Sequence, residues 1–220
     1  MKSFNKEKFK KLLDTNVFGQ NLIHFSSIAS TNDHAINMLN NIDPSKLENI
    51  NGILVLADEQ TGGRGRFNRQ WLSPPGGLWF SLIFRTDLRT DKIPAITLIA
   101  AFCTADVLIR YYDINVNIKW PNDLYYEDCK FGGILSESKK IGSSHMIILG
   151  MGLNIAIDKK NIDKIDKKVV SLQDITKKVI KPEPLLARIL KNFEELYIHF
   201  LQTGDLGSIF KRIEKILRYD

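Results

Sequence analysis

Cysteine and histidine are scarce in this sequence, and their positions exclude several kinds of catalytic site. The two cysteines, Cys103 and Cys129, form no CxxC pair, and Cys103 lies in an apolar run with helical spacing. We therefore expect reduced thiols in a cytosol-like compartment. The four histidines are scattered, and none belongs to a motif with a serine or a cysteine. This pattern argues against a nucleophilic triad and against a zinc site.

Two nucleotide-binding fingerprints and long apolar runs are also missing. Gly150-x-Gly152 lacks the third glycine of a dinucleotide fingerprint, because Ile155 stands in its place, and no Gly-Lys dipeptide completes a P-loop. No apolar run has the length expected of a membrane span, and the N-terminus lacks a signal-peptide core. The sequence thus predicts a cytoplasmic protein without a membrane partner, and neither an NAD enzyme nor a P-loop NTPase.

The overall composition is that of an ordinary globular chain with a basic balance. Of 220 residues, 44% are hydrophobic and 25% are charged, and the formal net charge is +6. This length favours one domain over residues 1–220. A basic balance suits an anionic substrate or an acidic partner, and it is weak support for nucleic acid. Much of the positive charge lies in the lysine-rich segment 158–181, which we interpret as a solvated face.

The apolar periodicity predicts several strands followed by helices. Strands are expected at 23–28, 53–57, 78–85, 116–120, in hairpin arms at 125–126 and 131–137, and at 146–157 with an interruption at 150–154. Helices are expected at 4–13, after a capping box at Ser30 and Asp33, from Pro94, after a second capping box at Ser171 and Asp174, from Pro184, and over 206–217. This order of elements is typical of an α+β layer architecture.

The stretch from Gln60 to Trp71 is the most unusual part of the chain. It holds Arg64, Arg66 and Arg69 within six positions, loosened by glycines, between two apolar strands. Guanidinium groups need anionic partners, and glycine lets the backbone approach a ligand closely. We predict a loop that closes over a polyanionic small molecule, anchored at both ends and mobile in its middle. A solvated basic surface loop is the alternative.

Two further polar positions suit adenylyl or phosphoryl transfer. Lys130 precedes Gly132-Gly133 inside an apolar hairpin, and Asp123 follows Trp-Pro-Asn at the end of a strand. Such transfer requires that charge on phosphorus-bound oxygens be neutralised as it redistributes. Each residue also has a simpler interpretation: Lys130 as a surface residue, and Asp123 as the cap of a turn rather than a proton acceptor. Ser30-Thr31-Asn32, taken alone, is a helix cap.

Several motifs together carry a family resemblance. GGRGRFNRQW, KWPNDLYY, KFGGILSE and GMGLN, preceded by STN, resemble the catalytic domain of biotin protein ligases from about Ser30 to Asn154, and more loosely to about residue 203. The resemblance implies an α+β fold similar to class II aminoacyl-tRNA synthetases, with a mixed, largely antiparallel sheet backed by helices. It also implies two reaction steps. Biotin and Mg-ATP give biotinyl-5′-AMP and pyrophosphate, and the biotinyl group then passes to one lysine of a biotin carboxyl carrier domain.

The resemblance assigns roles residue by residue. Positions that match the biotin site are Ser30, Thr31, Asn32, Gln60, Gly63, Arg64, Gly65, Arg66, Lys130 and Gly133. Positions that match the ATP site are Arg64, Arg66, Arg69, Trp71, Asn122, Lys130 and Asn154. Among catalytic positions, Arg66 and Arg69 match residues near the phosphates, and Lys130 matches the lysine that bridges the biotin carboxylate and the α-phosphate. Asp123 matches the carboxylate that receives the proton of the acceptor lysine. No metal ligand is assigned.

The ends of the chain depart from the larger relatives. No N-terminal DNA-binding domain is expected, and hence no operator DNA as partner. A terminal helix at about 204–220 is expected where many relatives begin a small C-terminal β-barrel domain. The oligomeric state stays open, with a homodimer among the options. Two alternatives remain: a lipoate–protein ligase of the same fold, and a non-enzymatic basic module that binds nucleic acid or acidic protein.

Overall fold

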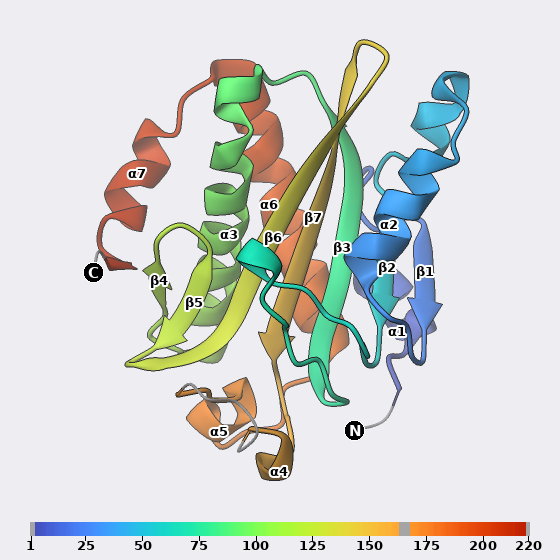
Figure 1. Ribbon diagram of the computed structural model, residues 1–220. Coiled ribbons are helices and arrows are strands. Elements are labelled where there is room, and N and C mark those ends of the chain that lie inside the picture. Colours follow the sequence, from blue (N-terminus) through green and yellow to red (C-terminus); the bar gives the residue numbers. More distant parts are fainter. Residues whose placement is uncertain (1–2, 163–167, 219–220) are drawn as a thin grey trace.

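A single eight-stranded sheet organises the part of the chain that the computed structural model describes, residues 3–162 and 168–218 (Figure 1). The strands are β1 (Leu22–Phe25), β2 (Leu54–Ala57), β3 (Gly77–Thr86), β4 (Asn117–Lys119), β5 (Asp123–Tyr126), β6 (Cys129–Ile141), β7 (Ser144–Asn154) and β8 (Leu217–Arg218). Their spatial order is β1-β2-β3-β7-β6-β5-β4-β8. Only the β1–β2 and β4–β8 pairs among these are parallel. The predicted mixed, largely antiparallel sheet is therefore confirmed.

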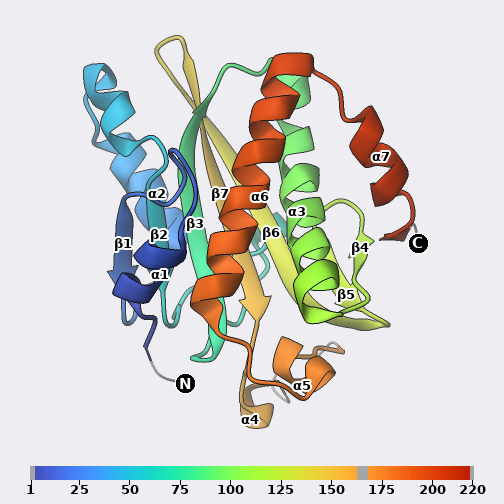
Figure 2. The same cartoon turned by 180° about the vertical axis from the view of Figure 1, so that it is seen from behind.

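Helices cover the two faces of the sheet unequally. The α-helices are α1 (Lys6–Leu12), α2 (Thr31–Asn40), α3 (Pro94–Tyr112), α4 (Lys159–Ile162), α5 (Leu172–Thr176), α6 (Pro182–Thr203) and α7 (Gly207–Ile213). Short 3₁₀ turns are η1 (Pro44–Ile50), η2 (Arg66–Asn68) and η3 (Thr90–Lys92). Figure 2 shows α3 and α6 side by side across the back of the sheet. On the front, α2 lies over β2 and β3, which leaves the middle of that face to other segments (Figure 1).

Two hydrophobic cores follow from the alternation of side chains along the strands. In β2, Leu54 and Leu56 belong to the large core under α3 and α6, whereas Val55 belongs to the smaller core under α2. In β7, Leu149 and Ile148 divide in the same way. Successive residues of a strand face opposite sides, so a sheet covered on both faces needs apolar residues at every position. This explains the continuous apolar runs in the sequence.

The helix caps form where the sequence predicts them. The Ser30 hydroxyl accepts a hydrogen bond from the Asp33 backbone N–H at 3.2 Å and begins α2. Ser171 accepts from the Asp174 N–H at 3.3 Å and begins α5. Each bond satisfies one of the N–H groups that a helix leaves unpaired at its start. Pro182, two positions before the predicted start at Pro184, opens α6.

Two predicted elements differ from the structure. Strand β7 continues through Gly150 and Gly152 without the predicted interruption, because glycine keeps its backbone groups and pairs with β3. The predicted helix over 206–217 ends at Ile213, and Leu217–Arg218 instead forms β8 beside β4. The Ile118 N–H of β4 donates to the Ile216 carbonyl at 2.7 Å. An unpaired strand edge favours such an addition over a further helical turn.

The apolar helix around α3 corrects another expectation. By length and composition, the segment Thr90–Tyr112 is the one helix among the described residues that is long and apolar enough to cross a membrane. However, 72% of its apolar window is buried inside the structure. Its apolar residues therefore face the sheet and α6, as predicted for a buried core helix.

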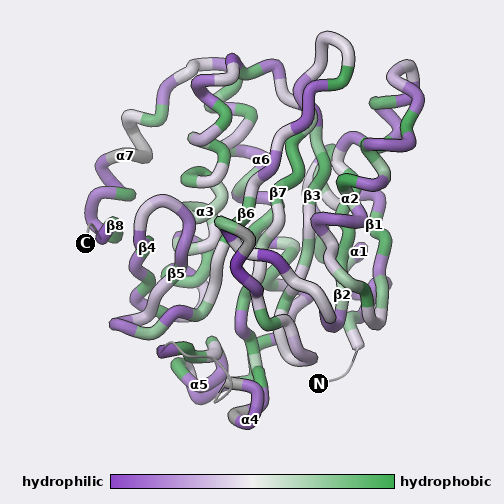
Figure 3. The backbone as a smooth tube through the Cα atoms, in the orientation of Figure 1, coloured by the Kyte–Doolittle hydropathy of each residue, from purple (hydrophilic) through white to green (hydrophobic). Residues whose placement is uncertain are grey.

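Polar segments lie at the margins of the sheet and in one loop across its front. Figure 3 shows hydrophilic stretches in the segment that crosses the front of the sheet between β2 and β3. The lysine-rich segment 158–181 is predicted to be a solvated face, and Lys168, Lys177 and Lys178 are indeed exposed. Leu172 is buried in the core, so the prediction of a solvated face does not hold for the whole segment. Residues 163–167 lie outside the described part of the chain.

Candidate active site

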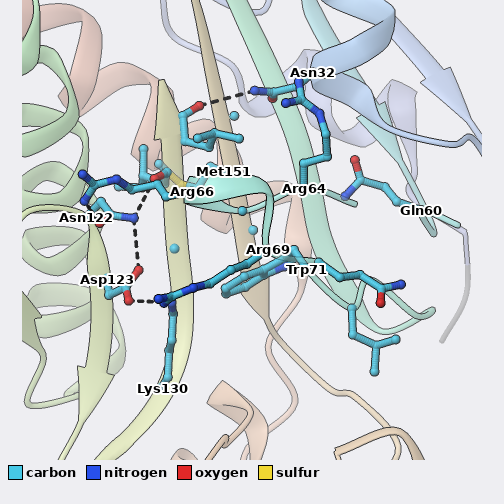
Figure 4. Close-up of a pocket in the computed structure, with 18 of the residues that line it drawn as sticks. Asn32, Gln60, Arg64, Arg66, Arg69, Trp71, Asn122, Asp123, Lys130 and Met151 are labelled. Carbon is cyan, nitrogen blue, oxygen red and sulfur yellow. Dashed lines mark hydrogen bonds and ion pairs between the residues drawn. The ribbon is translucent and has the colours of Figure 1, made fainter. Parts of the chain in front are cut away.

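A cavity of about 550 Å³ lies on the front face of the sheet, beneath the loop from Gln60 to Ser73. Strands β5, β6 and β7 supply its floor, and the start of α2 closes one end (Figure 4). The predicted site residues that line it are Ser30, Thr31, Asn32, Gln60, Arg64, Gly65, Arg66, Arg69, Trp71, Asn122, Asp123, Lys130, Gly133 and Asn154. The structure thus brings together predicted residues from five separate segments of the sequence.

Backbone hydrogen bonds hold the loop from Gln60 to Ser73, which we call the flap, against itself. The Gln60 N–H donates to the Ser73 carbonyl at 2.9 Å, and the Trp71 N–H donates to the Gly63 carbonyl at 2.8 Å. Gly63 itself does not line the cavity, and its assignment to the biotin site stays a prediction. A Cβ at this position would lie 2.4 Å from the Trp71 carbonyl oxygen, so Gly63 permits the close backbone approach. The mobility of the loop stays a prediction.

One end of the cavity is a network of uncharged hydrogen-bonding groups. The Gln60 Oε1 accepts from the Thr31 N–H at 2.8 Å and from the Thr31 hydroxyl at 3.0 Å. The Ser81 hydroxyl of β3 lies 2.6 Å from Asn32 Oδ1 and 2.8 Å from Thr31 Oγ1. Ser30, Thr31 and Asn32 are buried, because α2 places its first turn against the sheet. The Ser30 motif is therefore both a helix cap and part of this polar end.

Arg64 lies at the same end and is held by two carboxylates. Its Nη2 lies 2.7 Å from Asp33 Oδ1 and 3.0 Å from Glu137 Oε2. Burial by itself lowers the pKa of Arg64, but the charges of Glu137 and Asp33 raise that pKa overall. Glu137 also accepts from the Asn32 amide at 2.7 Å. The positive charge that the sequence assigns to the phosphates is, at Arg64, already neutralised by protein groups.

The opposite end carries the catalytic candidates. Lys130 Nζ lies 2.6 Å from Asp123 Oδ2 and 4.9 Å from the centre of the Trp71 ring (Figure 4). Asn122 donates to Asp123 Oδ1 at 3.1 Å and accepts from Arg66 Nη1 at 2.9 Å. Arg66 therefore ties the flap to the turn between β4 and β5.

No sequence motif predicted the backbone segment that pairs with Lys130. The Lys130 N–H donates to the Lys168 carbonyl at 2.9 Å, and the Val170 N–H donates to the Lys130 carbonyl at 3.1 Å. The Asn154 amide donates to the Val170 carbonyl at 3.3 Å. Asn154 thus braces this segment as well as lining the cavity. Backbone pairing of this kind fixes where the Lys130 side chain begins.

Glycines in the floor make room for two side chains above it. A Cβ at Gly150 would lie 2.0 Å from Asn32 Oδ1, and one at Gly152 would lie 2.6 Å from Trp71 Nε1. That indole nitrogen is buried and has no hydrogen-bond partner among the residues that the structure describes. The motif GMGLN contains both glycines, so it was the available signal for this floor. Glu137 lies likewise within KFGGILSE.

The arrangement can neutralise anionic oxygens and transfer a proton. Within residues 3–162 and 168–218, no group of three or more His, Cys, Asp and Glu side chains is placed to hold a metal ion. Lys130, Arg66 and Arg69 line one end of the cavity together with Asp123. An ammonium and a guanidinium can stabilise charge on a phosphoryl group, and a carboxylate within reach can accept a proton from an amine.

Comparison with known proteins places this cavity in a family. Residues 25–154 match the model described as the biotin/lipoate A/B protein ligase family. The chain is 35% identical over 195 residues, 87% of its length, to the bifunctional ligase/repressor BirA of Bacillus spizizenii. It is 30% identical over 211 residues, 91% of its length, to a human biotin–protein ligase. It spans 58% of the first relative and 28% of the second.

Solved structures support the same placement. A biotin protein ligase from Aquifex aeolicus, in complex with biotin and ATP, superimposes with a TM-score of 0.73 at 27% identity. The match covers 91% of this chain and 79% of the other. The sequence motifs, the sheet and the cavity agree with these matches, and the chain belongs to the biotin/lipoate A/B protein ligase family.

Proposed function

We propose that this chain activates biotin with ATP and transfers the biotinyl group to a lysine of a carrier domain. One observation carries the proposal: the Lys130–Asp123 pair lies at one end of a cavity whose other end presents hydroxyl and amide groups, with the charge of Arg64 there neutralised by Asp33 and Glu137. A non-enzymatic basic module would use the arginine loop as a surface patch. It would leave this pair inside the cavity without a role.

The polar end favours biotin over lipoate, although the family contains ligases for both. The ureido ring of biotin offers two N–H donors and one carbonyl acceptor, whereas a dithiolane ring offers only weakly accepting sulfur. Thr31, Asn32 and Gln60 present hydroxyl and amide groups that can exchange hydrogen bonds with a ureido group. A dithiolane has no strong donor or acceptor for the hydrogen-bonding capacity that these groups retain beyond their bonds to one another. Relatives named biotin–protein ligases support the same choice.

The first step joins two anions, and the cationic end suits it. A carboxylate oxygen of biotin attacks the α-phosphorus of ATP, the bond to the β-phosphate oxygen breaks, and pyrophosphate leaves. We infer that the Lys130 ammonium, 2.6 Å from Asp123, binds both the carboxylate and the α-phosphate and so reduces their repulsion. Arg66 and Arg69, which line the cavity, would bind phosphate oxygens. The flap above excludes water from the mixed anhydride.

The second step needs a neutral amine. The acceptor lysine attacks the acyl carbon, AMP leaves, and the proton of the amine passes to the Asp123 carboxylate, held at 2.6 Å from Lys130 and 3.1 Å from the Asn122 amide. We expect Mg²⁺ to enter with ATP, since this ion is commonly bound by substrate phosphates and few protein carboxylates. The partner would be a carrier domain of a biotin-dependent carboxylase.

Pyrophosphate release from ATP tests this assignment directly. The purified chain is assayed with biotin, with lipoate and without either acid, and the acyl-adenylate is identified by mass. We expect release that depends on biotin, with lipoate at background. Release with lipoate but not biotin would reverse the choice of substrate. If neither acid causes pyrophosphate release and the chain binds nucleic acid in a salt-sensitive way, the basic module would be supported.

A further inference from the structure

Two exposed aromatic residues stand at the mouth of the cavity. Phe67 is 81% exposed and Trp120 is 53% exposed, and both border the cavity. The other large hydrophobic side chains that are exposed among the described residues lie away from it. Aromatic residues exposed together beside a binding site are a common sign of a protein contact. We refer to Phe67 and Trp120 as the aromatic rim.

Phe67 contributes little to the fold in its present position. It lies in η2 and has a left-handed backbone conformation at φ 57°. The segment between β2 and β3 that contains η2 crosses in front of the sheet (Figure 1). A bulky residue rarely adopts this conformation, and an exposed ring buries little apolar surface in return. The Cζ atoms of Arg66 and Arg69 lie 5.0 and 6.0 Å from the centre of its ring. Such a residue is better explained by a partner than by folding.

Trp120 borders the same cavity from a different segment of the chain. It follows β4, two positions before Asn122, whose side-chain Oδ1 accepts the hydrogen bond from Arg66. This bond links the flap to the turn that carries Trp120. The two aromatic residues are therefore held on neighbouring segments by one contact rather than placed independently.

The sheet edge beside the rim limits how a partner can approach. On the outer side of β4, Ile118 and Lys119 pair with Leu217 and Arg218 of β8. A partner cannot add a strand there, because the backbone groups of β4 are already paired. Contact with β4 itself must therefore come from side chains.

We propose that the aromatic rim is the contact surface for the acceptor protein around its target lysine. This inference rests on the proposed function, since only an amine inside the cavity can reach an acyl group near Lys130 and Asp123. The partner is a folded domain that presents the lysine beside apolar side chains. Acidic groups on that domain would face Arg69 and Lys119, which also border the mouth.

Separate assays of the two steps test the rim. Phe67→Ala and Trp120→Ala are compared with Tyr111→Ala, which removes an aromatic residue that is 59% exposed on α3 and does not border the cavity. Pyrophosphate release without acceptor measures the first step. Transfer is then measured to a purified carrier domain and, separately, to hydroxylamine, a nucleophile too small to touch the rim. A salt series on the wild-type protein tests the charge contribution.

The rim residues should affect only the protein acceptor. Each rim variant should raise KM for the carrier domain by about tenfold or more, as for a contact residue at the centre of an interface. The value of kcat, the first step and transfer to hydroxylamine should not change, and Tyr111→Ala should match the wild type. KM for the carrier should rise with salt.

Other outcomes separate the two proposals. An unchanged KM for the carrier would overturn the proposal for the rim alone, because Phe67 and Trp120 would then not contact the acceptor. An equal loss of rate with hydroxylamine and in the first step would also overturn it, because the two residues would then act on the nucleotide. A wild-type chain that forms no biotinyl-adenylate would overturn the proposed function, and the rim with it.

Discussion

Replacing Lys130 by alanine separates the chemistry of the site from its stability. The ammonium lies 2.6 Å from Asp123 Oδ2, and the two side chains are 18% and 25% exposed. Loss of a preorganised positive group that stabilises developing charge costs about 10²- to 10³-fold in rate. We therefore expect Lys130→Ala to slow biotin-dependent pyrophosphate release by about that factor.

The effect on folding should be small. A partly exposed ion pair contributes about 1 kcal/mol or less, which corresponds to a fall in Tm of about 2–4 °C for a chain of this size. Lys139→Ala is the matched control, since Lys139 lies on the same strand, contacts Asn40 and does not border the cavity. It should keep full activity.

Two results would refute the reasoning about Lys130. The first is a rate of pyrophosphate release within about threefold of wild type, far less than the expected loss. Lys130 would then not act between the carboxylate and the phosphate. A fall in Tm of about 10 °C or more would instead assign the loss of activity to damaged folding.

Three other predictions follow from the structure. Gly152→Ala places a Cβ 2.6 Å from Trp71 Nε1, so the indole should move and its fluorescence should shift. Pyrophosphate release should fall by about 10²-fold. Unchanged fluorescence would contradict the packing of Trp71 on Gly152. Glu194→Ala removes a buried carboxylate that accepts three backbone N–H groups at 2.6, 2.8 and 2.8 Å, so chemical denaturation should show a loss of about 3 kcal/mol, against less than about 0.5 kcal/mol for the exposed Glu195→Ala. Burial raises the pKa of Tyr197 to about 12 from 10.0, so the stability present below pH 10 should fall as pH rises towards 12, by up to about 2.7 kcal/mol, and ultraviolet titration should find one phenol that ionises near 12.

The fold was predictable where local signals and burial agree. The caps at Ser30 and Ser171, the apolar strands and the buried helix α3 all appear where the periodicity placed them. The structure around Gly150 was not predictable, because a glycine can either interrupt a strand or lie within one and leave space for a side chain that packs on it. Only the position of Asn32, far away in the sequence, decides between the two.

The site was predictable as a set of residues but not as a geometry. Motifs located Lys130, Asp123 and the arginine loop, and the structure places them in one cavity. Composition could not show that Arg64 lies at one end of the cavity and Arg66 and Arg69 at the other. The position of Arg64 depends on its ion pairs with Asp33 and Glu137, which come from other elements. The backbone segment that holds Lys130 is equally a long-range contact with no motif of its own.

Strand β8 has a consequence for the order in which the domain can form. The hairpin of β5 and β6 pairs residues close in the sequence, whereas β4 receives its outer neighbour from Leu217 and Arg218. During synthesis, α7 and β8 leave the ribosome after every other strand of the sheet. Until then, the edge of β4 stays open, and contacts between distant residues form slowly. Trp120, Asn122 and Asp123, which directly follow β4, would thus gain their full support only as β8 docks.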